Sequence, residues 1–212
     1  MWELVKAGGW LMLPLVLCSI FTVAITIERM IRLKKSLILP KALLLNQTQN
    51  AHAVMQQLQQ DEALKGSTLG RIFTAGYQSK NQNEQYARAQ MEVTASQEIG
   101  YLEKNINFLG TLSAVAPLLG LLGTVLGVIE SFLVIDLGTN SNPTLMIPGI
   151  SKALITTAAG MFIAIPALFA YRYFQRLVQE YVAELEQQST LFHAALFYQN
   201  STVEEQDLRK AG

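Results

Sequence analysis

The sequence has few charged residues, and they are unevenly distributed along the chain. Only 15% of the 212 residues are Asp, Glu, Lys or Arg, whereas about a quarter are charged in a typical water-soluble domain. Three runs contain none of these side chains: 7–27, 105–129 and 153–171. Because about 20 apolar helical residues cross a hydrocarbon core about 30 Å thick, we expect an all-α, polytopic membrane protein with three transmembrane helices.

The chain also has few cysteines and histidines and no net charge, which argues against several classes of function. Cys18 is the only cysteine, so no internal disulfide can form, and His52 and His193 stand apart from any cluster with metal-ligand spacing. The net charge of zero argues against a nucleic-acid partner, which would favour a basic face. We therefore expect no enzyme activity, no metal and no cofactor.

Positive charge predicts the orientation of the spans. Basic side chains follow the first span and the third, whereas the loop between the second and third spans contains none. The positive-inside rule then places the N-terminus and that loop outside the cytoplasm. The predicted order is a periplasmic N-terminus with an uncleaved first span (1–28), a cytoplasmic helical region (29–104), the second span (105–134), a short periplasmic loop (135–147), the third span (148–171) and a cytoplasmic amphipathic helix with a tail (172–212).

The region between the first two spans is rich in helix-forming residues. Asp61 and the segments 66–68 and 80–83 predict breaks, which leaves about three helices, the last running from near Glu84 directly into the second span. After the third span, apolar residues recur every three or four positions, as expected for an amphipathic helix packed on the other cytoplasmic helices. These residues are Phe174, Leu177, Val178, Tyr181, Leu185, Phe192 and Ala195, and a polar tail begins at Ser201.

Small and polar residues form stripes on the second and third spans, whereas the first span is bulky all round and is expected to face lipid. The stripes contain Ser113, Pro117, Gly120, Thr124, Gly127 and Ser131, and then Ala153, Thr157, Gly160, Ala164 and Ala167. Small residues predict close helix packing, as in Gly123-x-x-x-Gly127, while Pro117 and Pro166 remove backbone donors and favour kinks. For Thr124 and Thr157, packing and pore lining remain equal alternatives.

Two charges lie near the ends of these apolar runs. Lys152 precedes Thr157 by five residues and Glu130 follows Thr124 by six. If the two threonines share a depth, both charges lie about 7–9 Å outward of it, at about 1.5 Å per residue. A charge within a membrane normally has a protein partner. We therefore predict a pair between Lys152 and Glu130, within one chain or between chains; the alternative is that Lys152 reaches the outer interface alone.

The stretches "APLLGLLGTVLGVIESF" and "PGISKALITTAAGMFIAIPALFAY" resemble the ExbB/TolQ proton-channel family and, more distantly, the MotA stators. The resemblance implies an ExbB-like inner-membrane homopentamer whose second and third spans line a pore. It also implies a single-span ExbD/TolR-like partner with an intramembrane Asp, and a TonB-like transducer through which the proton motive force energises transport. Thr124 and Thr157 match the family's pore threonines.

One position departs from the family pattern. Lys152 stands where the family usually has a glutamate, and a lysine with an ordinary pKa near 10.4 is a poor proton relay at neutral pH. Either Glu130 supplies part of the electrostatic function, or the position serves assembly only. The alternatives to a proton motor are a non-conducting scaffold for partner helices and a TolQ/MotA-type stator for another process.

Overall fold

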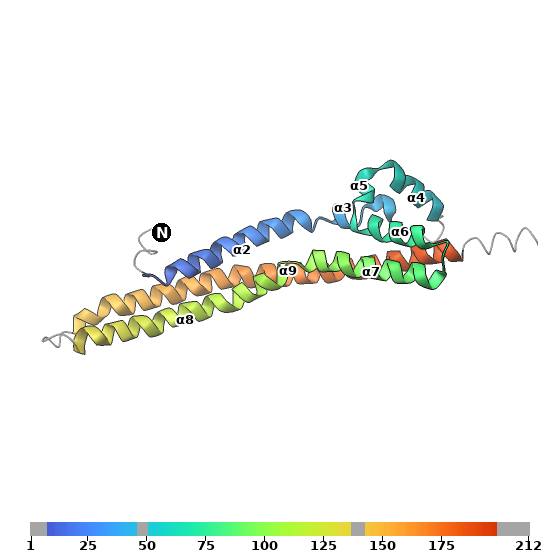
Figure 1. Ribbon diagram of the computed structural model, residues 1–212. Helices are drawn as coiled ribbons and strands as arrows, with labels where there is room; N and C mark the ends of the chain where they lie inside the picture. The colour runs from blue at the N-terminus through green and yellow to red at the C-terminus, as the bar shows by residue number, and fades with distance from the viewer. Residues whose placement is uncertain (1–7, 46–50, 137–142, 199–212) are drawn as a thin grey trace, which may run out of the picture. The chain divides into compact units, whose positions relative to one another are not determined.

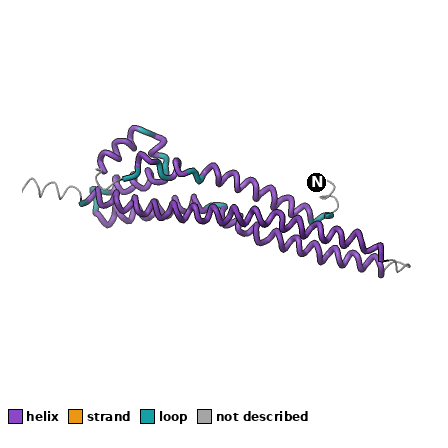
Figure 2. Tube along the Cα trace, turned by 180° about the vertical axis from the view of Figure 1, so that it is seen from behind, coloured by secondary structure: helices purple, strands orange, loops and turns teal. Residues whose placement is uncertain are grey.

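The computed structural model describes residues 8–45, 51–136 and 143–198 (Figure 1), although not the side chains of 134–136 and 143. All regular structure in this part of the chain is helical (Figure 2). The long elements are α2 (Met12–Arg32), α4 (Ala51–Gln60), α6 (Thr68–Ser79), α7 (Glu84–Glu103), α8 (Ile106–Asp136) and α9 (Ile147–Phe197); the short ones are α3 (Lys35–Ile38), η1 (Lys41–Leu43), α5 (Glu62–Lys65) and η2 (Pro143–Met146). The predicted tail from Ser201 and the centre of the predicted 135–147 loop lie outside the described residues.

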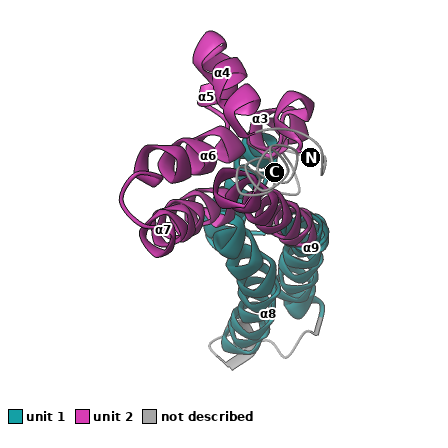
Figure 3. Cartoon of the chain, turned by 90° about the vertical axis from the view of Figure 1, so that its right-hand side faces the viewer, with its two compact units in different colours: residues 1–29, 105–175 teal, residues 30–104, 176–212 magenta. Residues whose placement is uncertain are grey.

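The chain divides into two compact units (Figure 3). Unit 1 comprises residues 1–29 and 105–175, and unit 2 comprises 30–104 and 176–212. Among the residues that the structure describes, three helical stretches are long and apolar enough to cross a membrane: Met12–Arg32, Glu84–Leu133 and Thr144–Phe197. Each of the three predicted spans overlaps one of these stretches, which supports the predicted class of an all-α polytopic membrane protein.

In unit 1, α8 and the first part of α9 form an antiparallel pair whose backbones touch through glycines. A Cβ atom at Gly160 would lie 2.6 Å from the Ala116 carbonyl oxygen, and one at Gly127 would lie 2.8 Å from the Gly149 carbonyl oxygen. A Cβ at Gly120 would lie 3.0 Å from the Thr156 carbonyl oxygen. The small residues of the predicted stripes therefore allow the two helices to pack closely. Such packing is expected in a membrane, because the hydrophobic effect does not drive helices together within lipid.

Helix α2 packs against one side of this pair. Met12 and Leu15 are buried in a cluster with Ala116 of α8 and Ala164 of α9. The opposite side of α2 is apolar and exposed, and includes Leu13, Leu17, Ile20, Val23 and Ile27. Helix α2 therefore has one side packed against protein and one apolar side suited to lipid. It is not surrounded by lipid on all sides.

The junction between α7 and α8 differs from the prediction. The helix that begins at Glu84 does not continue directly into the second span, because Asn105 adopts a left-handed backbone with φ 63°. Asn residues tolerate this conformation better than other non-glycine residues. The Asn105 amide also donates a hydrogen bond of 3.1 Å to Glu28 Oε2 at the end of α2, which stabilises the break.

Unit 2 contains the predicted helix breaks, each with a capping side chain. The Asp61 carboxylate accepts from Ala63 N, Ser67 Oγ accepts from Gly70 N, and the Asn83 side chain accepts from Gln85 N. Such oxygens satisfy donors that the first helical turn leaves unpaired.

The amphipathic part of α9 supplies much of the core of unit 2. Phe192 is fully buried and stacks on Phe73 of α6, with ring centroids 4.1 Å apart. Gln188 Oε1 accepts a buried 2.7 Å hydrogen bond from Leu45 N. Four residues of the predicted apolar face lie in this unit and are buried: Val178, Tyr181, Leu185 and Phe192.

Candidate functional site

The glycine contact between α8 and α9 fixes the position of the two threonines of interest. Thr157 Oγ1 donates a 2.9 Å hydrogen bond to the Gly120 carbonyl oxygen across the helix pair. Thr124 lies one turn further along α8, and its Oγ1 donates to the Leu121 carbonyl oxygen of its own helix at 2.7 Å. Both side chains are half-buried. Each hydroxyl proton is thus directed at a backbone carbonyl, which leaves the oxygen lone pairs as acceptors.

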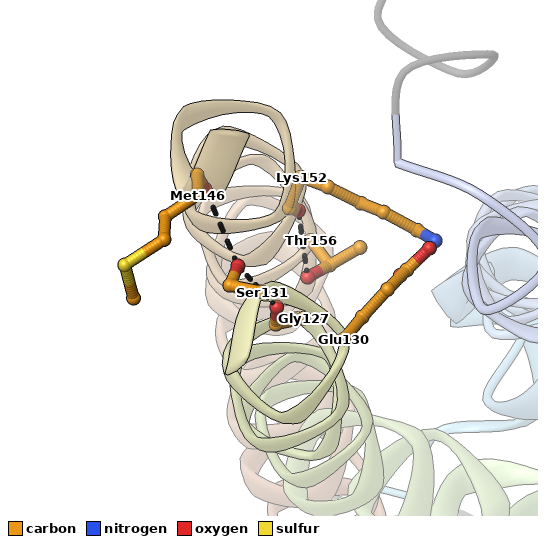
Figure 4. Close-up of polar contacts among 6 residues, drawn as sticks. All are labelled: Gly127, Glu130, Ser131, Met146, Lys152 and Thr156. Carbon is orange, nitrogen blue, oxygen red and sulfur yellow. Dashed lines mark hydrogen bonds and ion pairs between the residues drawn. The ribbon is translucent and has the colours of Figure 1, made fainter. Parts of the chain in front are cut away.

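The structure also brings the two charged residues together. Lys152 Nζ lies 2.7 Å from Glu130 Oε2 within a single chain. Figure 4 shows the two side chains leaving α9 and α8 on the same side and meeting at their ends. Glu130 is more exposed than Lys152, at 57% against 31% of the side chain. The pair therefore bridges the two helices at their connected end, while its part in function stays a prediction.

The threonines and the ion pair lie on opposite sides of the α8–α9 pair. At about 100° per residue, Thr157 lies about 140° around α9 from Lys152, and Thr124 about 120° around α8 from Glu130. On each helix, the residues that contact the other helix, such as Gly123 on α8, lie at angles between the threonine and the charged residue. The ion pair is therefore on the side that α2 covers, and the threonines are on the side that no part of the described unit 1 covers.

The threonine side is otherwise apolar. Leu121 of α8 is 57% exposed, and Leu154 and Met161 of α9 are 64% and 49% exposed. We call the surface formed by Leu121, Thr124, Leu154, Thr157 and Met161 the threonine face. A mostly apolar surface with two half-buried hydroxyls about one helical turn apart can contact other helices while offering hydrogen-bond acceptors.

Two buried polar residues also lie in this contact, and sequence reasoning did not single out one of them, Thr156. Thr156 is 1% exposed, and its Oγ1 donates to the Ala153 carbonyl oxygen at 2.8 Å while its side chain fills the space left by Gly123. Ser131 Oγ donates to the Gly127 and Met146 carbonyl oxygens at 2.8 and 3.3 Å (Figure 4). Ser131 belonged to the predicted stripe, but the register of Thr156 against Gly123 had no signal in either helix alone.

The two prolines that were predicted to favour kinks lie within long helices. Pro117 and Pro166 lie inside α8 and α9 respectively. Among the residues that the structure describes, no group of three or more His, Cys, Asp or Glu side chains could hold a metal ion. The contact between α8 and α9 thus offers hydroxyl and carbonyl oxygens and the Lys152–Glu130 ion pair as its polar groups.

Comparison with known proteins gives the family. Residues 65–187 match the model of the MotA/TolQ/ExbB proton channel family. A Synechocystis protein named as a biopolymer transport protein, ExbB-like 1, is 31% identical over 206 residues, covering 91% of this chain and 78% of that protein.

Two further relatives match over shorter stretches. The Tol-Pal system protein TolQ of Haemophilus influenzae is 35% identical over 111 residues, covering 50% of this chain and 49% of that protein. The biopolymer transport protein ExbB of Salmonella typhimurium is 39% identical over 85 residues, covering 40% of this chain and 35% of that protein. With three membrane-capable helices and a family match over more than half of its length, the chain belongs to the MotA/TolQ/ExbB proton channel family.

Proposed function

We propose that the chain is the channel and motor subunit of an ExbB-ExbD-like complex in a bacterial inner membrane. Five copies surround a pore, and their threonine faces point inward. The pore holds the transmembrane helix of a single-span ExbD/TolR-like protein that carries an intramembrane Asp. Proton flow through this site energises transport or an envelope process through a TonB-like transducer.

One observation carries this proposal: the position of Thr124 and Thr157 on the exposed side of the helix pair. A lipid-facing surface needs no half-buried hydroxyls, whereas a surface around a titrating carboxyl group does need hydrogen-bond partners at its depth. Since both hydroxyl protons are donated to backbone carbonyls, the oxygens are suited to accept a hydrogen bond from the protonated acid. This arrangement favours the neutral form of the acid, because a hydrogen bond to the neutral form raises its pKa.

The proposed orientation follows from the charges. Arg29, Arg32, Lys34 and Lys35 follow the first span, and Arg172 follows the third. The positive-inside rule puts these residues in the cytoplasm, which leaves the connected end of α8 and α9 on the periplasmic side. The Lys152–Glu130 pair would then lie near the periplasmic end of the pore-forming helices.

The test is proton flux through the complex purified with its single-span partner and reconstituted in liposomes. Thr157→Val keeps the side-chain shape but removes the hydroxyl, and we expect flux to fall at least tenfold. The matched control is Thr26→Val on α2, whose hydroxyl bonds the Thr22 carbonyl oxygen of its own helix at 2.7 Å; flux should stay within twofold. Undiminished flux in assembled Thr157→Val complexes would refute a proton role, and an assembled complex without flux in the parent protein would favour a scaffold.

A further inference from the structure

The side of the ion pair that faces away from the threonines is in contact with the start of α2. A Cβ atom built at Gly9 would overlap Lys152 Cε and would lie 3.0 Å from Lys152 Nζ. The lysine side chain therefore passes directly over the backbone of Gly9 on its way to Glu130. Gly9 has φ +72°, a conformation that favours glycine for a second, independent reason.

The neighbouring residues of the same segment contact the same side of the pair. A Cβ at Gly8 would lie 3.4 Å from Thr156 Cγ2. The Gly9 carbonyl oxygen accepts a 3.1 Å hydrogen bond from Met12 N, so the segment leads directly into the first turn of α2. A cavity of about 290 Å³ lies here, lined by Gly8, Trp10 and Leu11 of the segment and by Glu130, Lys152 and Thr156 among others.

The segment 8–11 precedes the anchor of α2. Leu11 and Met12 are 6% and 7% exposed, and Leu15 is fully buried, whereas Trp10 is 69% exposed. Apolar burial in a membrane protein gains little free energy from leaving lipid, so polar contacts and close packing decide whether a helix stays docked. The lysine over Gly9 supplies a close contact, and Glu130 fixes the position of that lysine.

We propose that Lys152 and Glu130 form a latch that holds the segment 8–11, and with it the start of α2, against α8 and α9. Lys152 is the positioning group because its side chain lies over Gly9, and Glu130 acts through Lys152. The latch explains why a lysine is useful at this position: a glutamate here would face Glu130 and leave the two carboxylates side by side. The proposal does not depend on proton conduction, since the docking of α2 can be measured without it.

Thiol labelling of the full chain in membranes tests the latch. The parent is Cys18→Ser with Leu11→Cys, which places a single thiol at a buried position of the segment. We expect Lys152→Met and Glu130→Gln each to raise the rate of reaction with a membrane-impermeant maleimide at least tenfold. Lys152→Arg, which keeps the charge and a long side chain over Gly9, should label within threefold of the parent. Lys104→Met, which removes an exposed lysine in unit 2, is the control for lost charge and should not change the rate.

A second measurement separates release of α2 from general unfolding. Hydrogen exchange of backbone amides should increase in peptides covering 8–15 and stay as in the parent in peptides covering 150–165. Labelling of Lys152→Met and Glu130→Gln at the parent rate would overturn the proposal, as would a Lys152→Arg variant that labels as fast as Lys152→Met. Equal loss of protection in both sets of peptides would also overturn it, because the pair would then stabilise α9 rather than hold α2.

Discussion

The contact between α8 and α9 predicts an unusually sharp difference between two glycine substitutions. At Gly160, an added Cβ would lie 2.6 Å from the Ala116 carbonyl oxygen and 3.1 Å from the Gly120 Cα. Both atoms belong to backbone and cannot move aside as a side chain can. Restoring an ordinary 3.4 Å contact would require the helices to separate locally by about 0.8 Å. Overpacking of this kind costs about 1–3 kcal/mol.

Gly100 in α7 is the matched control because an added Cβ there would meet nothing within 4 Å. Gly100→Ala should stabilise its helix, since alanine is better than glycine in a helix interior by about 0.8–1 kcal/mol. For a chain of this size, each kcal/mol shifts Tm by about 2–4 °C. Gly160→Ala gains the same helix preference, so the overpacking cost of about 1–3 kcal/mol appears as the difference between the two variants. We therefore expect Gly100→Ala to raise Tm by a few degrees and Gly160→Ala to unfold about 2–12 °C below Gly100→Ala in detergent. Equal Tm values for Gly160→Ala and Gly100→Ala would refute the close contact between the two helices.

Two further predictions concern packing and the backbone. Phe192→Ala removes a fully buried ring stacked on Phe73 and should cost about 3–5 kcal/mol, seen as faster amide exchange in α6; unchanged exchange there would contradict the proposed core. Asn105→Ala loses the hydrogen bond to Glu28 and leaves at φ 63° an alanine, which has no polar side chain to hydrogen-bond locally; the left-handed conformation then costs about 1–2 kcal/mol. Asn105→Gly loses the same hydrogen bond without that conformational cost and should be the more stable of the two in thermal unfolding, so equal stability would argue against the strained junction.

Much of this fold could be predicted from local sequence signals. The uncharged runs identified the three spans because a membrane core excludes charge over a fixed helix length. The breaks at Ser67 and Asn83 could be located because side-chain caps act within three residues of the helix start. The apolar positions around Phe192 indicated a buried face because the helical period of 3.6 residues is fixed by the backbone.

The parts that could not be predicted depend on contacts between segments. Nothing local distinguishes Thr156, which fills the contact with Gly123, from Thr157, which lies beside it. The depth estimate placed Glu130 and Lys152 at one level, and the structure has them 2.7 Å apart. The sequence could not show, however, that the ion pair lies on the side of the α8–α9 pair that α2 covers, because this depends on where α2 packs. The break at Asn105 likewise depends on a hydrogen bond to Glu28, 77 residues earlier in the chain.

The claim most open to direct test is that the threonine face borders the proton path. In a Cys18→Ser background, Thr124→Cys places a thiol on this face, and Leu13→Cys places one on the exposed side of α2. Proton flux of the reconstituted complex is measured before and after reaction with a small methanethiosulfonate reagent, with modification followed by mass spectrometry. The account predicts that modification at position 124 abolishes most of the flux and modification at position 13 leaves it unchanged. Undiminished flux through complexes fully modified at position 124 would contradict it.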